Sequence, residues 1–167
     1  MINFQNFKKE LKSLPLIGKG TSRKVYDLGN GTVAKVATNV KGIAQNKQET
    51  EIYEEDSSDY YSLKLFAIVY DHNENYSIII AEKCIKIKSI KQLKILLDDT
   101  DGEETEIHYE NTIEELFHRF QLGKRDLKRP SSWGLNSKNE PVLIDYGLTG
   151  QVWEEHYYRV KKYTIHY

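Results

Sequence analysis

Residues 14–37 decide the fold, and they spell LPLIGKGTSRKVYDLGNGTVAKVA. Three short apolar runs in this stretch predict strands over residues 14–18, 25–28 and 32–37. The last two runs are joined by Gly-Asn-Gly at residues 29–31, which supplies the positive φ angles that a tight hairpin turn needs. The chain is therefore expected to open with an antiparallel meander of three strands.

Seven further elements are predicted beyond this meander: a helix over 43–55, strands over 65–70 and 77–81, helices over 89–97 and 112–122, and strands over 133–135 and 142–144. Strands thus gather in the first half of the chain, and helices follow in the second. This order predicts an α+β fold and disfavours an all-parallel α/β sheet.

The composition narrows the class of protein further. A chain of 167 residues with 39% hydrophobic residues has enough apolar surface for one folded domain. The formal net charge of −1 provides no global basic field for nucleic acid or a membrane. The single cysteine, Cys84, excludes an internal disulfide, and no long apolar segment is present. We expect a single cytoplasmic domain with no membrane partner.

Four motifs extend outward from the opening meander in a fixed order: residues 18–25 (GKGTSRKV), 33–35 (VAK), 125–128 (RDLK) and 145–147 (DYG). Together they resemble the signature set of protein kinases, and the resemblance spans residues 14–150. It implies a kinase-like fold with two lobes. Residues 1–83 would form a lobe with a five-stranded antiparallel sheet and one helix, and residues 84–167 a helical second lobe.

The second lobe is expected to be abbreviated, because only residues 148–167 follow the last motif. This leaves little chain for the later helices that hold peptide substrates in full-size kinases. The chain in this respect is similar to minimal kinase-like proteins of phages and bacterial effectors.

The glycine motif lies between two predicted strands, so it is similar to a kinase phosphate-covering turn and not to a Rossmann turn, which opens a helix. Gly18 and Gly20 would let the backbone approach phosphate oxygens, and Val25 would cover the adenine. Arg23 stands where the family has its third glycine. Two outcomes are open for Arg23: it crowds the phosphates, or it adds a positive charge to them.

The resemblance assigns Lys35 to the α- and β-phosphates and pairs it with a helix glutamate. Both Glu49 and Glu51 are available, and they point to nearly opposite sides of a helix. Glu49 is favoured, because apolar residues follow it at the third and fourth positions and would bury its face. Glu82 and Cys84, at the boundary between the two lobes, are further nucleotide-binding candidates.

The catalytic candidate in the second lobe is Asp126, which the resemblance implies would orient the acceptor hydroxyl and take its proton. Asp145 would hold Mg²⁺. Ser132 would be a further metal ligand, where the family has an asparagine one residue closer to the catalytic aspartate, and Lys124 stands where the family has histidine. Because a hydroxyl is a weaker metal ligand than an amide oxygen in good geometry, nucleotide binding without transfer is an alternative.

These assignments imply a phosphotransferase that uses ATP and Mg²⁺ and acts on a Ser, Thr or Tyr hydroxyl of a protein. The alternative is a pseudokinase that works as a protein-binding or inhibitory module. Nucleic-acid binding through the basic residues 124–129 near Trp133 is disfavoured, because this cluster is short and local. The aromatic residues Trp153, Tyr157, Tyr158 and Tyr163 either pack as a helix on the second lobe or form a protein interface.

Overall fold

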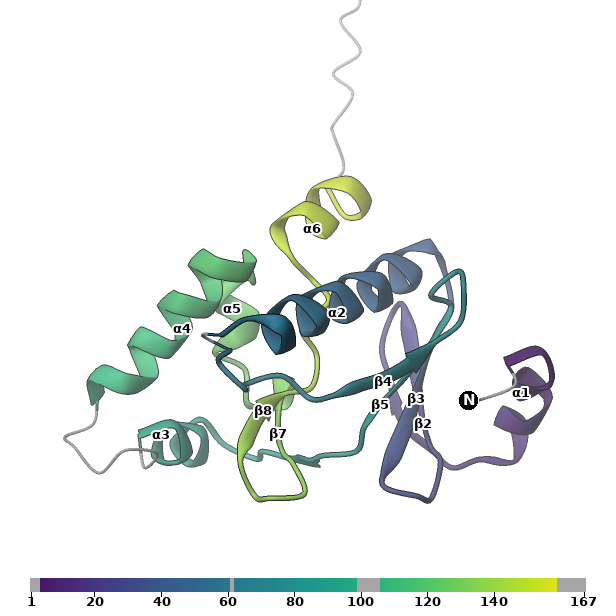
Figure 1. Ribbon diagram of the computed structural model, residues 1–167, viewed down its shortest axis with the longest axis horizontal. Helices are drawn as coiled ribbons and strands as arrows, with labels where there is room; N and C mark the ends of the chain where they lie inside the picture. Colours follow the sequence, from purple (N-terminus) through teal and green to yellow (C-terminus); the bar gives the residue numbers. More distant parts are fainter. Residues whose placement is uncertain (1–3, 61, 99–105, 159–167) are drawn as a thin grey trace, which may run out of the picture.

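Two antiparallel sheets organise the chain in the computed structural model, which describes residues 4–60, 62–98 and 106–158 (Figure 1). The larger sheet has the strand order β1-β2-β3-β5-β4, and the smaller one has the order β6-β7-β8. The strands are β1 (Leu16–Lys19), β2 (Arg23–Asp27), β3 (Thr32–Ala37), β4 (Val69–His72), β5 (Ile78–Glu82), β6 (Ile85–Lys86), β7 (Trp133–Leu135) and β8 (Pro141–Leu143).

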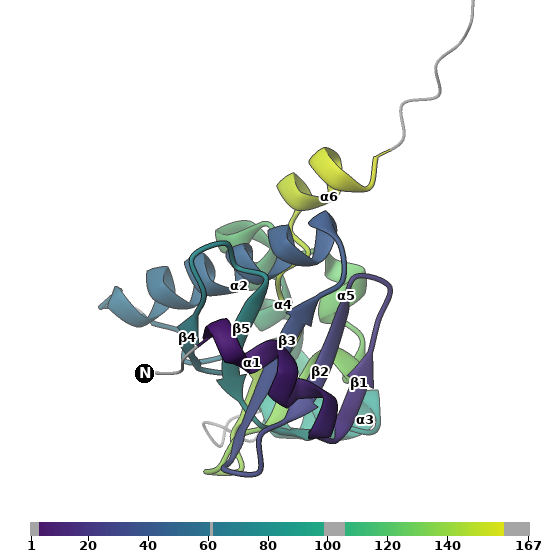
Figure 2. The same cartoon turned by 90° about the vertical axis from the view of Figure 1, so that its right-hand side faces the viewer.

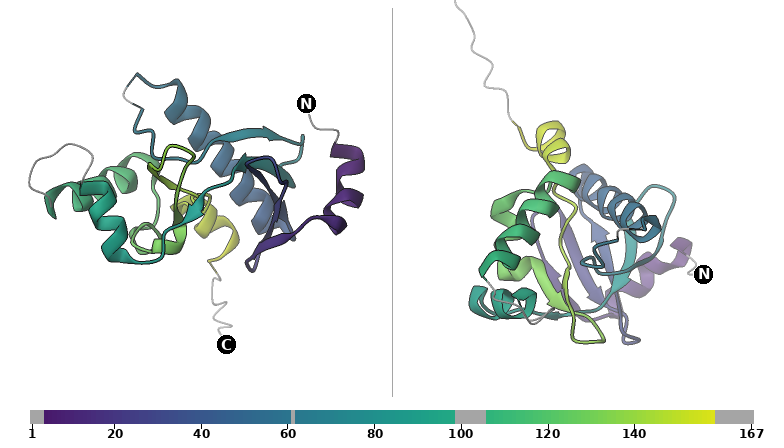
Figure 3. Two further views of the ribbon diagram at one scale, coloured as in Figure 1. Left: turned by 90° about the horizontal axis from the view of Figure 1, so that it is seen from below. Right: turned by 60° about the vertical axis from the view of Figure 1, so that its left-hand side comes forward.

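Helices surround both sheets: α1 (Phe4–Glu10), the 3₁₀ turn η1 (Leu11–Ser13), α2 (Val40–Ser58), α3 (Ile90–Asp98), α4 (Glu106–Phe120), α5 (Lys124–Leu127), the 3₁₀ turn η2 (Pro130–Ser132) and α6 (Gly150–His156). The pair α3 and α4 and the helix α1 lie at opposite ends of the molecule, with the two sheets between them (Figure 3). Within the described ranges, no helix combines the length and the apolar character needed to cross a membrane.

The predicted α+β class and the five-stranded antiparallel sheet are confirmed, and several element boundaries are corrected. The strand expected over residues 65–70 begins only at Val69, because residues 65–67 run beside β8 instead. There the Ala67 amide donates to the Leu143 carbonyl at 2.9 Å, and the Leu143 amide donates to the Leu65 carbonyl at 2.6 Å. Phe66 thereby enters the core of the second half of the chain.

Helix α2 is longer than the predicted helix over residues 43–55. It starts at Val40 because the Asn39 side chain caps it, accepting hydrogen bonds from the Lys41 and Gly42 amides. Helix α4 likewise begins earlier than predicted. The strand expected over 25–28 begins at Arg23 and ends at Asp27. The elements α1, η1, β6, α5 and η2 were not predicted, whereas α6 lies in the segment for which a helix was one of two alternatives.

The five-stranded sheet is covered on both faces. Phe7 of α1 and Leu11 of η1 pack with Ala34, Ile78 and Ile80 of β3 and β5, so this N-terminal segment shields one face (Figure 2). Helix α2 packs against β3 on the other face. All residues of β5 are buried, as expected for a central strand enclosed on both sides.

A larger core joins α2, α3, α4 and the smaller sheet. Trp133 of β7 is fully buried there, and its indole Nε1 donates to the Leu127 carbonyl at 2.7 Å. This bond fixes the C-terminal end of α5, and it therefore sets where the neighbouring Asp126 lies.

Candidate functional site

A cavity of about 390 Å³ has β1, β2 and β3 on one side and α5, η2 and the segment after β8 on the other. This volume lies within the usual range for small-molecule sites. Nine of the ten predicted site residues line it: Gly18, Gly20, Val25, Lys35, Glu82, Cys84, Asp126, Ser132 and Asp145. The tenth, Glu49, is fully buried beside Lys35.

Lys35 points from the middle of β3 toward α2. Its Nζ pairs with the Glu49 carboxylate and donates to the Ile144 carbonyl at 2.7 Å. Glu51, the other helix carboxylate, is exposed and lies 3.5 Å from Lys47 one turn away. The structure thus places Glu49, and not Glu51, beside Lys35.

Glu49 accepts from two cations in a fully buried position. Burial alone would raise the pKa of the Glu49 carboxyl, but Arg23 and Lys35 together hold this pKa below its ordinary value. For Arg23, burial alone would lower the pKa of the guanidinium. The nearby carboxylates of Glu49 and Asp145 outweigh this effect and raise the pKa above its ordinary value. Glu49 and Arg23 are therefore both charged at neutral pH.

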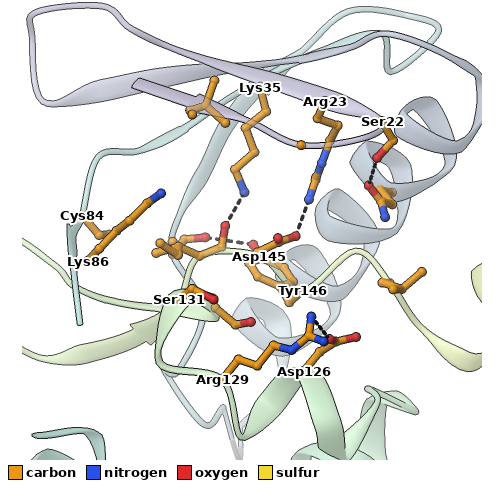
Figure 4. A pocket seen from close by; sticks show the side chains of 18 of the residues that line it. Ser22, Arg23, Lys35, Cys84, Lys86, Asp126, Arg129, Ser131, Asp145 and Tyr146 are labelled. Carbon is orange, nitrogen blue, oxygen red and sulfur yellow. Dashed lines mark hydrogen bonds and ion pairs between the residues drawn. The ribbon is translucent and has the colours of Figure 1, made fainter. Parts of the chain in front are cut away.

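Arg23 is the site residue whose role the sequence did not predict. Its Nη1 donates to Glu49 Oε1 at 2.8 Å and to Asn46 Oδ1 at 3.3 Å. Its Nη2 pairs with Asp145 Oδ1 (Figure 4). Its guanidinium is thus directed at two carboxylates. Alternation along β2 could have indicated this role, because it puts Arg23 on the same face of the sheet as Val25. Val25 is paired with Lys35 of the neighbouring strand β3.

The Asp145-Tyr146-Gly147 motif is packed tightly onto α2. The Tyr146 amide donates to Glu49 Oε1 at 3.2 Å, and its buried hydroxyl donates to the Ala67 carbonyl at 2.9 Å. A Cβ on Gly147 would lie 2.2 Å from the Gln45 carbonyl oxygen, so only glycine fits there. The Asp145 side chain, by contrast, is 61% exposed and faces the cavity.

Asp126 lies on the opposite wall, in the short helix α5. Arg129 Nη1 forms an ion pair with Asp126 Oδ1 at 2.9 Å, and Ser131 lies nearby (Figure 4). Lys124, for which the sequence resemblance predicted the position of a kinase histidine, pairs with Glu114 of α4 at 2.6 Å and does not line the cavity.

The basic residues 124–129 are largely neutralised in the fold. Lys124 pairs with Glu114, Lys128 pairs with Glu110 at 2.9 Å, and Arg129 pairs with Asp126. Each of these three cations therefore has a carboxylate partner within the chain.

Glu82 and Cys84 lie at the edge of the cavity where β5 leads into β6. The Glu82 amide donates to the Ile68 carbonyl at 2.8 Å, so it belongs to the sheet. Burial, reinforced by the nearby Glu82, raises the pKa of the Cys84 thiol to about 12. Cys84 therefore contributes surface to the cavity and not a thiolate.

The turn between β1 and β2 is connected to α2 and α6. The Gly20 amide donates to the Arg23 carbonyl at 2.8 Å, and Ser22 Oγ donates to Gln45 Oε1 at 2.7 Å. Gln45 Nε2 in turn donates to the Tyr157 hydroxyl at 3.0 Å. One amide of α2 thus links the turn to the C-terminal helix.

The aromatic residues near the C-terminus differ in exposure, and Tyr157 contacts the predicted first lobe instead of the second. Tyr157 packs on α2, where Lys41 Nζ lies 4.2 Å from its ring centroid. Trp153 and Tyr158 are 45% and 59% exposed. Tyr163 lies outside the described residues.

The cavity has few groups for a metal ion. No cluster of three or more His, Cys, Asp or Glu side chains occurs in the part of the chain that the structure describes. Asp145 and the buried hydroxyl residue Ser132 both line the cavity. This set fits Mg²⁺, which proteins usually hold through one or two carboxylates together with substrate phosphates and water.

Comparisons with known proteins give weak similarities only. No family model and no curated protein matches the chain. SAICAR synthase from Saccharomyces cerevisiae is 16% identical, over 81% of this chain and 74% of that one, with a TM-score of 0.41. The choline kinase LicA from Streptococcus pneumoniae is 14% identical, over 84% and 67% of the two chains, with a TM-score of 0.39. At these scores, neither similarity supports an inference about the chemistry of this chain.

Proposed function

We propose that this chain is a kinase-like phosphotransferase that binds ATP with Mg²⁺ in the cavity and transfers the γ-phosphoryl group to a hydroxyl group of a protein. The observation that carries the proposal is the convergence of Lys35, with its buried partner Glu49, and Asp145 on one cavity whose opposite wall bears Asp126. Such a site works mainly through positioning and fixed charge.

Each group has a specific part in the proposed reaction. Lys35 binds phosphate oxygens, and Glu49 holds its ammonium in place. Asp145, together with Ser132, would hold Mg²⁺, which neutralises phosphate charge when bound. Asp126 accepts the proton of the acceptor hydroxyl as that oxygen bonds to the γ-phosphorus and the bond to the departing ADP breaks.

The test is transfer of labelled γ-phosphate to the chain itself or to proteins of a cell extract. Asp126→Asn is expected to lower the transfer rate by at least about 100-fold, which is the lower end of the usual contribution of general base catalysis. Nucleotide binding should persist. Asp145→Asn is expected to weaken Mg²⁺-dependent binding. Glu51→Gln, an exposed carboxylate on α2, is the matched control and should leave both measurements unchanged.

A second candidate function is a pseudokinase that binds nucleotide and a protein partner without transfer. Two observations favour it: Lys124 is held by Glu114 away from the cavity, and Ser132 offers a hydroxyl in place of an amide. Mg²⁺-dependent nucleotide binding with no transfer above that of Asp126→Asn would select this candidate. Absence of nucleotide binding would rule out both.

A further inference from the structure

We propose that Arg23 is a positioning residue that fixes the Asp145 carboxylate for a divalent cation and ties it to helix α2. This inference rests on the proposed function, because the cation is the one that would accompany the nucleotide. Arg23 itself need not touch the nucleotide.

The geometry of the guanidinium supports this role. One nitrogen, Nη1, faces α2 through Glu49 and Asn46, and the other, Nη2, faces Asp145 on the segment after β8. The planar fork of arginine holds two carboxylates in fixed directions, which the single ammonium of lysine does not do equally well. Arg23 thus joins two elements that are far apart in the sequence.

The two carboxylates that Arg23 contacts differ in burial. The Arg23 side chain is 9% exposed and that of Glu49 is fully buried, whereas the Asp145 side chain is 61% exposed. The buried pair therefore forms an anchor, and the exposed carboxylate is the group that it holds. A carboxylate offers about four lone-pair sites, so the contact at Oδ1 leaves capacity for a cation in the cavity.

The same part of α2 also holds Lys35. Glu49 pairs with Lys35 Nζ, and Asn46 Nδ2 donates to the Lys35 carbonyl at 3.3 Å. The position of α2 therefore determines where the Lys35 ammonium lies through Glu49, and where the Asp145 carboxylate lies through Arg23. Without Arg23, the Asp145 carboxylate would lose its side-chain link to this helix, while the Tyr146 amide and Lys35 kept their bonds to Glu49.

This difference gives a measurement that separates positioning from general damage. A fluorescent ATP analogue is titrated onto the full chain, first in EDTA and then at fixed analogue concentration with increasing Mg²⁺. Arg23→Lys is expected to raise the half-saturating Mg²⁺ concentration about tenfold, near the low end of what one hydrogen bond to a charged group contributes. The affinity for the analogue in EDTA depends on Lys35, and it should change less than about twofold in Arg23→Lys.

A double variant tests whether Asp145 carries the effect. In an Asp145→Asn background, Arg23→Lys should add no further increase in the Mg²⁺ requirement, because the group that it positions is already altered. Arg23→Gln gives a second test if Arg23→Lys folds poorly, and a smaller increase is expected for it, because it also removes a positive charge that repels the cation.

The matched control is Arg119→Lys. Arg119 also bridges two carboxylates, Asp59 at 2.6 Å and Asp56 at 3.6 Å, but it does not line the cavity. It should lower stability without changing the Mg²⁺ requirement. An unchanged requirement in both Arg23 variants, with wild-type binding intact, would overturn this inference alone. Absence of Mg²⁺-dependent binding in the wild type would overturn the proposed function and this inference with it.

Discussion

The backbone amide of Tyr146 donates to the carboxylate of Glu49 at 3.2 Å, and this bond ties the segment after β8 to the middle of α2. The two residues are 97 positions apart, yet the same carboxylate also pairs with Lys35 and Arg23. A single buried side chain thus receives groups from β2, β3 and the Asp145-Tyr146-Gly147 motif. Most of the expected effects of substitution in this site depend on that convergence.

Removing the Glu49 carboxylate should destabilise the fold strongly. Glu49→Gln leaves Lys35 and Arg23 buried with less negative charge, and breaking a buried ion pair from one side costs about 3–5 kcal/mol. The free energy of unfolding in urea measures this loss. Glu51→Gln on the exposed face of α2 should change it by less than about 0.5 kcal/mol. Equal stability of the two variants would contradict the role assigned to Glu49.

The same carboxylate should make stability sensitive to acid. The pKa of Glu49 in the folded chain is lowered, so its contribution is fully present above the pKa of an unfolded glutamate. That contribution is lost progressively as the pH falls through the lowered folded value. Urea midpoints measured from pH 7 down to pH 3 should therefore converge for the wild type and Glu49→Gln. A constant difference across this range would show that Glu49 is not the titrating group.

Gly147 should tolerate no side chain. A Cβ there would lie 2.2 Å from the backbone oxygen of Gln45, and neither backbone can yield without moving α2. Gly147→Ala is expected to cost about 3 kcal/mol or more of stability, as severe overpacking does. Gly150→Ala is the control, since the nearest atoms to its Cβ lie at 3.9 Å. Thermal unfolding of the two variants compares them directly.

Tyr146→Phe should separate stability from ligand binding. The substitution removes the hydroxyl that donates to the Ala67 carbonyl, and it keeps the ring that packs 4.8 Å from Phe66. A loss of about 1 kcal/mol is expected, the usual net contribution of one hydrogen bond. Nucleotide affinity should stay within twofold of the wild type, about 0.4 kcal/mol. A larger loss of affinity would show that the hydroxyl also acts on the cavity.

Cys84 should react slowly with alkylating agents. Burial and Glu82 raise the pKa of its thiol to about 12, from an ordinary value of 9.0. A difference of about three units lowers the thiolate fraction near pH 8 about 1000-fold relative to the unfolded chain. Iodoacetamide labelling followed by mass spectrometry, with and without denaturant, measures the ratio. Labelling at equal rates in both conditions would contradict the assigned environment.

Alternation and spacing in the sequence predicted the strand that carries Lys35 and the strand that precedes Asp145, because short apolar runs record which face of a sheet is buried. Arg23 shows where this reasoning stops. A charged residue at a strand start is typically solvated, and its burial here depends on the docking of α2, a tertiary event that local pattern does not encode. The shift of residues 65–67 toward β8 has the same origin, because partners more than seventy positions away decide it.

Helix α1 was missed for a different reason. The first residues are mostly polar, and the apolar positions that matter, Phe7 and Leu11, become meaningful only once the sheet offers them a surface. The choice of Glu49 over Glu51 could be made from the sequence, because it depends only on the spacing of apolar residues along one helix. The three-residue strands at the second sheet were predicted within one residue, since a polar turn separates them.

Gly42 and Gly147 have a joint consequence for how this protein could be controlled. A Cβ on Gly42 would lie 2.1 Å from the Ser22 carbonyl oxygen, and the Gly147 backbone approaches Gln45 equally closely. Main chain therefore lies close to neighbouring positions of the helix, Gly42 and Gln45, and a roll about the helix axis would disturb both contacts. A switch that rotates this helix would therefore have to displace the Ser22 and Gly147 backbones together with it.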